Sequence, residues 1–122
     1  MRPHKSDPSR IERELMRGAG PVAVMTLLAS RGEMYGWELI EALAQRSKGV
    51  LDMGQATLYP MLYNLEAKGL VRATWRQAAT GRRRKYYALT GKGRKRLALE
   101  RRQWRDVARA MEGLGVLDQS AP

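Results

Sequence analysis

The chain has 122 residues, enough for one domain, and its 23 lysines and arginines against 12 acidic residues give a formal net charge of +11. Such a balance suits a polyanionic partner, whether duplex DNA, RNA or an acidic membrane surface. Cysteine is absent and the only histidine is His4, which excludes disulfides and histidine or thiolate metal sites and favours a reducing cytoplasm. The sequence also has no apolar run of membrane-spanning length.

The N-terminal third is expected to begin with an arm and continue with two helices. Residues 1–9 are polar and contain two prolines, so they predict a flexible arm. Residues 11–16 have apolar side chains one helical turn apart and predict a short helix, which Gly18 and its neighbours should end. Pro21 is well placed to open the next helix. Residues 22–30 are apolar on nearly all sides, which is typical of a buried helix.

Two helices and a β-hairpin are expected next. Residues 35–45 carry apolar side chains on one helical face, and residues 54–68, followed by Gly69, predict a further helix. The segments 70–76 and 85–89 are rich in β-branched and aromatic residues. Because they flank the turn sequence QAATG, they predict a hairpin.

The helix expected at 54–68 has two chemically different faces. At about 100° per residue, the apolar side chains between Leu58 and Leu65 fall in one arc that should face the core. The opposite face offers hydroxyl, phenol and amide groups that can approach base edges, and Asn64 suits adenine. A solvent-facing helix of another α/β module would look similar, so the helix alone leaves both interpretations open. The residues predicted to contact DNA from this helix are Gln55, Thr57, Tyr59, Pro60, Tyr63 and Asn64.

Four adjacent cations lie at the tip of the expected hairpin. Such a run is commonly just solvated, because like charges repel one another in the free protein. Opposite a phosphate backbone the same cluster gains affinity by releasing counterions. Its place on a hairpin after a helix with a polar face favours DNA contact. The cations predicted to bind are Arg82, Arg83, Arg84 and Lys85, with alternate residues on opposite faces of the strand.

The final helix is expected to start after the N-cap Thr90 and to run to about Glu112, with residues 113–122 as a disordered tail. Apolar side chains repeat along it at heptad spacing. A domain of this size needs little of that length for its own core, so the apolar row predicts an interface with a second copy, although packing within one chain remains open. The predicted interface residues are Leu97, Trp104, Val107, Met111 and Leu114.

The motifs ATLYPMLYNLEAKGLV and ATGRRRKYYALTGKG, in this order, resemble the PadR family of bacterial transcription regulators over roughly residues 20–111. The resemblance implies a mainly α fold with a small β-hairpin (α+β): a winged helix-turn-helix DNA-binding domain at residues 10–90 and a C-terminal dimerisation helix at 91–112. It also implies a planar aromatic effector between subunits, with Trp104 suitably placed to stack on it. As an alternative, Trp104 is ordinary interface packing.

We therefore predict a homodimeric transcriptional repressor that binds double-stranded DNA at a palindromic operator. We expect it to act in the cytoplasm and to need no cofactor. A basic RNA- or ribosome-binding module is the alternative that composition also allows. An enzyme is not expected, because the body of the chain has no cysteine, no histidine and no phosphate-binding glycine motif.

Overall fold

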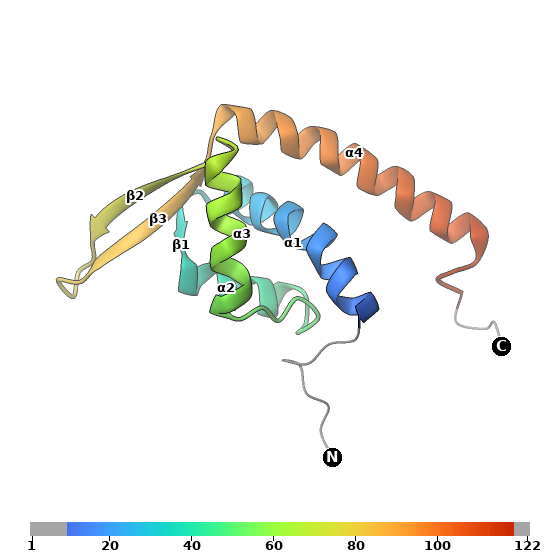
Figure 1. Ribbon diagram of the computed structural model, residues 1–122, viewed down its shortest axis with the longest axis horizontal. Helices are drawn as coiled ribbons and strands as arrows, with labels where there is room; N and C mark the ends of the chain where they lie inside the picture. Colours follow the sequence, from blue (N-terminus) through green and yellow to red (C-terminus); the bar gives the residue numbers. More distant parts are fainter. Residues whose placement is uncertain (1–9, 119–122) are drawn as a thin grey trace, which may run out of the picture.

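The computed structural model describes residues 10–118, so the arm predicted for residues 1–9 and the last residues of the predicted tail lie outside the described part. The described chain is α+β, as predicted: the helices form the body, and a long β-hairpin of the small antiparallel sheet projects from one side of it (Figure 1). In chain order the elements are α1 (Arg10–Arg31), β1 (Met34–Tyr35), α2 (Gly36–Arg46), α3 (Gln55–Ala67), β2 (Val71–Gln77), β3 (Arg83–Leu89) and α4 (Gly91–Leu114).

α1 is one continuous helix of 22 residues, and the prediction of a short helix at 11–16 followed by a separate one was wrong. Pro21 lies inside it and cannot donate the backbone hydrogen bond expected at that position. Tertiary packing outweighs this loss. Gly20 lies directly against the end of the Met61 side chain of α3, and Leu28 is buried in the core.

α2 and α3 have well-defined ends. Tyr35 is the N-cap of α2, and its backbone N–H donates to Glu38 Oε1 at 3.1 Å. α3 ends at Ala67, and Gly69, two residues later, has a φ of +74°, the left-handed conformation that glycine adopts readily. The backbone N–H of Leu70 donates to the Leu65 carbonyl at 2.9 Å, which closes the helix end. The predicted helix at 54–68 is confirmed to within one residue at each end.

The sheet has the strand order β1-β3-β2, and both pairings are antiparallel. β2 and β3 pair from Val71 opposite Leu89 to Gln77 opposite Arg83, so the predicted hairpin is present. β1 was not predicted, because two residues are too short to show a strand pattern. It adds Tyr35 opposite Tyr86.

The core lies between α1, α2, α3 and the inner face of the sheet. Fully buried residues from each of these elements meet there, among them Val24, Leu39, Leu62 and Tyr87. Leu97 is the last core residue of α4. Beyond it the helix extends past the body of the chain (Figure 1), and residues 101–118 are all exposed. Within residues 10–118, no helix combines the length and apolar character that a membrane crossing requires.

Candidate nucleic-acid interface

The outward face of α3 is set by the burial of its inward face. Leu58, Leu62 and Leu65 are buried, so the positions on the opposite face of α3 project to solvent. α3 continues through Pro60, and its N-cap is Gly54, whose carbonyl accepts from the N–H groups of Thr57 and Leu58. The exposed residues include five of those predicted to contact DNA: Gln55, Thr57, Pro60, Tyr63 and Asn64.

Tyr59 differs from the other predicted contacts on α3. It is half-buried and packs against the core, and its hydroxyl lies directly against Gly36 at the start of α2. A β-carbon at position 36 would collide with this hydroxyl. The ring therefore joins α2 to α3, a role that the helical pattern did not indicate.

The hairpin is closed by a tight turn. The Ala78 N–H donates to the Arg82 carbonyl at 2.6 Å, and the Gly81 N–H donates to the Ala78 carbonyl at 2.9 Å. Gly81 has a φ of +89°, where a side chain would be strained. The Gln77 side-chain amide also donates to the Gly81 carbonyl at 3.3 Å. These bonds fix the path of the cations that follow.

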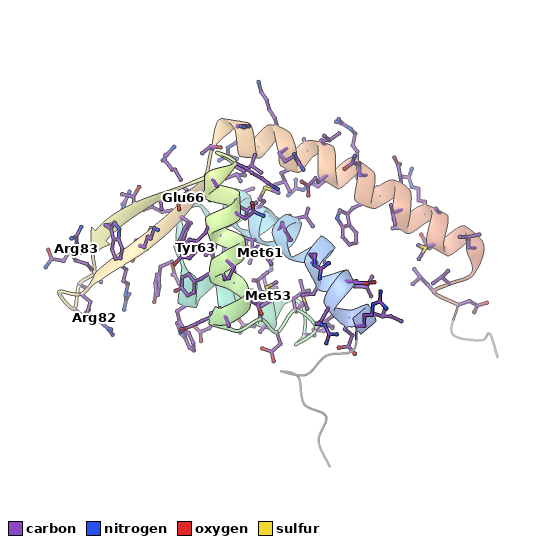
Figure 2. The ribbon with its side chains drawn as sticks, in the orientation of Figure 1. Met53, Met61, Tyr63, Glu66, Arg82 and Arg83 are labelled. Atoms are coloured by element: carbon purple, nitrogen blue, oxygen red, sulfur yellow. The ribbon has the colours of Figure 1, made fainter. Side chains whose placement is uncertain are left out.

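The four cations of the hairpin are in different environments. Arg82, in the turn, and Arg83, the first residue of β3, are exposed, and both lie at the far end of the hairpin (Figure 2). The Arg84 guanidinium lies 4.4 Å from the centre of the Tyr35 ring, on the opposite face of β3 from Arg83. The sequence predicted that these residues alternate between faces but did not indicate the aromatic partner.

Lys85 connects the hairpin to α3. Its Nζ lies 5.3 Å from the Tyr63 ring centre and 3.8 Å from the Glu66 carboxylate. Tyr63 and Glu66 project from α3 on the side that faces the hairpin (Figure 2). The outward face of α3 and this face of the hairpin therefore form one continuous surface.

Tyr87 lies beneath this junction and is fully buried. Burial raises the pKa of its hydroxyl from 10.0 to about 12, with smaller contributions from Tyr63, Glu66 and Tyr59. Among the described residues, the Tyr87 hydroxyl has no hydrogen-bond partner. The Lys85 Nζ lies 5.6 Å from its ring centre. The phenol thus stays neutral under the cationic surface.

A second ion pair holds the other side of the hairpin. Arg76 Nη1 of β2 lies 2.8 Å from the Glu33 carboxylate in the segment between α1 and β1. Arg76 pairs with Arg84 across the strands, so both lie on the face of the hairpin on which Arg84 contacts the Tyr35 ring. Neither Glu33 nor Glu66 was singled out from the sequence, since their partners lie far away along the chain.

The residues predicted for the dimer interface fall into two groups. Four of them are exposed on α4, as residues that contact a partner must be before it binds: Trp104, Val107, Met111 and Leu114. Leu97 is only 3% exposed and belongs to the core of its own chain. Ile11 and Leu15 on α1, which contacts α4, are exposed as well.

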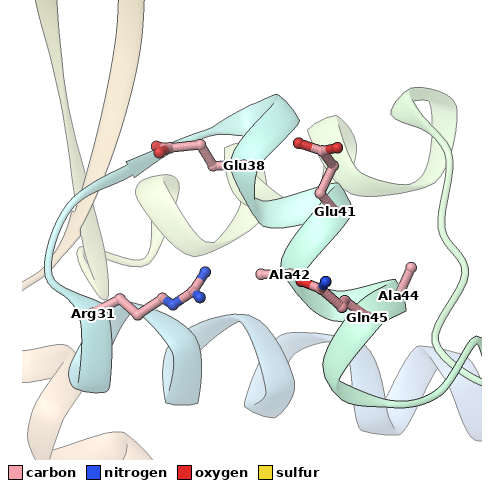
Figure 3. Close-up of a pocket in the computed structure, with 6 residues that line it drawn as sticks. All are labelled: Arg31, Glu38, Glu41, Ala42, Ala44 and Gln45. Carbon is pink, nitrogen blue, oxygen red and sulfur yellow. The ribbon is translucent and has the colours of Figure 1, made fainter.

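A shallow pocket of about 600 Å³ lies elsewhere, between the end of α1 and α2 (Figure 3). Arg31 comes from α1, and the other lining residues come from α2 (Figure 3). Two of these are carboxylates, Glu38 and Glu41, and the lining contains no aromatic ring. Trp104 does not line this pocket. In residues 10–118 no group of histidine, cysteine or acidic side chains is arranged to hold a metal ion.

A helix whose polar face adjoins a cationic β-hairpin defines a winged-helix protein. Residues 24–99 match the model of the Transcriptional regulator PadR-like family, and the chain belongs to that family. Its members are transcriptional regulators and not enzymes. The family model ends at residue 99, so most of α4 lies outside the match.

Similar proteins agree with this assignment. A transcriptional regulator of Mycobacterium tuberculosis is 34% identical over 101 residues, covering 83% of this chain and 90% of the relative. A PadR family transcriptional regulator from Eggerthella lenta has a TM-score of 0.71 and 30% identity, covering 91% of each chain. A PadR-like regulator from Bacillus cereus has a TM-score of 0.73 and 26% identity, covering 83% of this chain and 95% of its own.

Proposed function

We propose that this chain is a DNA-binding repressor that acts in the cytoplasm as a homodimer on a palindromic operator. The observation that carries the proposal is the position of Lys85, which joins the exposed face of α3 to the hairpin. α3 would enter the major groove, and the hairpin would follow the backbone towards the minor groove. Family membership supports DNA binding in general, and the contacts around Lys85 support this particular surface.

Each predicted contact has a role in this proposal. Asn64 and Tyr63 would read base edges, and Gln55, Thr57 and Pro60 would approach the backbone and thymine methyl groups. Arg82 and Arg83 would place positive charge against the DNA, since both are exposed. Arg84, Lys85 and Tyr59 would mainly hold the hairpin, α3 and α2 in position.

The homodimer would form through the exposed apolar surface of α4, with Ile11 and Leu15 as a second contact. Apolar patches on a small protein mark interaction sites, and this row is long enough to pair with a second helix. Residues 10–90 would then act as the DNA-binding domain and 91–112 as the dimerisation helix. A planar aromatic effector would bind between the subunits near Trp104, as the family resemblance implies. The pocket of Figure 3 has no aromatic ring on which such a molecule could stack.

Binding to DNA upstream of the protein's own gene tests the proposal. The full chain is titrated onto that duplex, onto a shuffled duplex of equal length, and onto a structured RNA of equal charge. A repressor should protect a palindromic segment and prefer it over both competitors by at least about 10³-fold. Preference for the RNA would support the alternative of an RNA- or ribosome-binding module. Transcription from the same promoter in vitro, with and without the protein, distinguishes repression from activation.

A further inference from the structure

Trp75 is a large aromatic side chain left exposed in the middle of the cationic hairpin. It lies on β2 opposite Lys85 and is 56% exposed. Tryptophan buries much apolar area when a partner covers it and is enriched at the energetic centres of interfaces. Neither the charge pattern nor the helical pattern of the sequence identifies this residue.

The strand register places Trp75 on the face that adjoins α3. Side chains alternate between faces along a strand, so Trp75 shares its face with Lys85 and, further towards the tip, with Arg83. Lys85 contacts Tyr63 of α3, which identifies this face as the one continuous with the proposed DNA-reading helix. Tyr63, Lys85, Trp75 and Arg83 therefore form a stripe from α3 to the tip, which we call the wing stripe.

Trp75 and Arg83 are already in contact. The Arg83 guanidinium lies 5.5 Å from the centre of the Trp75 ring, within the range of a cation–π interaction. The turn is fixed by its hydrogen bonds, so the strand that carries Arg83 has a defined path. A guanidinium that rests on an indole loses less rotamer freedom when it binds a ligand.

We propose that Trp75 and Arg83 act together as a minor-groove clamp. The Trp75 indole packs against the deoxyribose that borders the groove, and the Arg83 guanidinium enters the groove. The inference rests on the proposed function and adds a contact residue and a kind of readout to it. Deoxyribose offers an apolar surface to an indole, and a narrow A·T-rich groove has the enhanced negative potential that attracts arginine. The clamp would therefore favour A·T-rich DNA where the hairpin meets the groove.

A duplex fits the wing stripe better than an acidic membrane does. The stripe continues at Tyr63 into the face of α3 that carries Asn64, whose amide matches a base edge and gains nothing from lipid. Trp75 is also flanked on its face by the charged Lys85, and Trp75 is the only indole on β2 and β3. A single indole beside a row of charged and polar side chains fits the groove of duplex DNA better than the surface of a membrane.

Tryptophan fluorescence and affinity measurements on the full chain test the clamp. Adding duplex should change the fluorescence of the wild type, and Trp75→Phe should abolish most of that change. The matched control is Trp37→Phe, which removes a similarly exposed tryptophan (52%) from α2 and should leave the change in place. Trp75→Ala should weaken duplex affinity about tenfold with the salt dependence unchanged, because no charge is removed.

The pair should also behave as a unit. Arg83→Ala should lower both the affinity for duplex and its salt dependence. The double variant, with Arg83→Ala and Trp75→Ala together, should bind more weakly than the wild type by a factor smaller than the product of the two single effects. Replacing A·T by G·C base pairs at the flanks of the DNA site, where the hairpin meets the groove, should reduce the affinity of the wild type more than it reduces the affinity of the Arg83→Ala variant. Circular dichroism and urea midpoints establish that each variant is folded.

Three results would overturn the clamp: wild-type affinity in Trp75→Ala, an unaltered DNA response in Trp75→Phe, or a Trp75 signal that responds to anionic phospholipid vesicles and not to duplex. These differ from failure of the proposed function itself, in which the wild-type chain would bind no duplex.

Discussion

Gly93 lies directly against the backbone carbonyl oxygen of Leu70, which joins the first turn of α4 to the segment between α3 and β2. Thr90 strengthens the same junction. Its hydroxyl accepts from the Gly93 N–H at 3.0 Å and donates to the Gly69 carbonyl at 2.7 Å. Lys92 Nζ donates to the Lys68 carbonyl at 2.8 Å. The end of α3 and the start of α4 are thus held together, so the direction of the proposed dimer helix depends on this junction.

The first prediction concerns that junction. Gly93→Ala should destabilise the chain by about 1–3 kcal/mol, because the added methyl meets backbone that cannot move away as a flexible side chain can. Gly91→Ala is the control, since nothing lies within 4 Å of its added methyl and alanine is the better helix former. Urea unfolding measures both. Equal stability of the two variants would show that the junction tolerates a side chain.

The second prediction separates the cations of the hairpin. Arg82→Ala should flatten the dependence of log affinity on log salt by about one unit, because an exposed phosphate contact is lost. Arg84→Ala should change that slope less and should lower stability by about 0.5–1 kcal/mol, since its guanidinium rests on Tyr35. Arg109→Ala on α4 removes equal charge away from the hairpin and controls for net charge. A slope that changes equally in all three variants would mean that only net charge matters.

The third prediction concerns sequence readout by α3. Asn64→Ala should reduce discrimination between operator and shuffled DNA by about 1–3 kcal/mol, the value of one good base contact, with little effect on shuffled DNA. Ala67→Ser, on the same exposed face one turn later, is a conservative control. Competition binding at fixed salt measures both affinities. A parallel fall on both duplexes would assign Asn64 to positioning and not to base recognition.

Much of the fold follows from local patterns, whereas the environments within the site do not. The amphipathic face of α3, the turn residues of the hairpin and the N-cap Thr90 are short-range signals, and the helix and strand positions followed from them. The role of Gly93 was not predicted, because its contact with Leu70 joins distant parts of the chain. Tertiary packing likewise carries α1 through Pro21.

The same reason explains what the sequence did not indicate about the cations. A run of four basic residues appears uniform, yet strand register brings Trp75 to Arg83, and the three-dimensional packing brings Tyr35 to Arg84 and α3 to Lys85. These partners become visible only when the pairing of β1, β3 and β2 is known. The number of charged residues can be read from the sequence, whereas the residues that contact each of them are known only from the fold.

The fourth prediction uses the buried phenol of Tyr87, whose pKa is raised from 10.0 to about 12 by burial. The folded state disfavours the phenolate, so the stability linked to this group is fully present below pH 10 and is lost as pH rises towards 12. Tyr87→Phe should remove this part of the alkaline loss. At neutral pH it should be neutral or stabilising, because the hydroxyl lacks a partner among the described residues.

Urea unfolding between pH 7 and 11 measures the free energy of unfolding of the wild type and of Tyr87→Phe. The prediction is tested by how the difference between these two free energies changes with pH. Tyr86→Phe, which changes the neighbouring residue on the other face of β3, should keep the alkaline loss of the wild type. A constant difference between wild type and Tyr87→Phe at every pH would contradict the prediction.

The fifth prediction concerns the homodimer. Trp104→Lys combined with Met111→Lys should give a folded monomer, because both side chains are exposed and two new charges would face the same surface of a partner. The monomer should bind the operator far more weakly, since one recognition helix is lost from a site whose half-sites are about 34 Å apart. Sedimentation at micromolar concentration measures the assembly.

Two further variants show which surface of α4 is used. Leu99→Lys adds a charge on the side of α4 away from Trp104 and should leave the dimer intact. Leu97→Lys should unfold the chain instead of dissociating it, because Leu97 is buried in its own core. If the dimer holds, quenching of tryptophan fluorescence by planar aromatic compounds in the wild type, but not in Trp104→Phe, would support an effector site at the interface. A wild-type chain that sediments as a monomer, or a double variant that remains dimeric, would place the self-association surface elsewhere or remove it altogether.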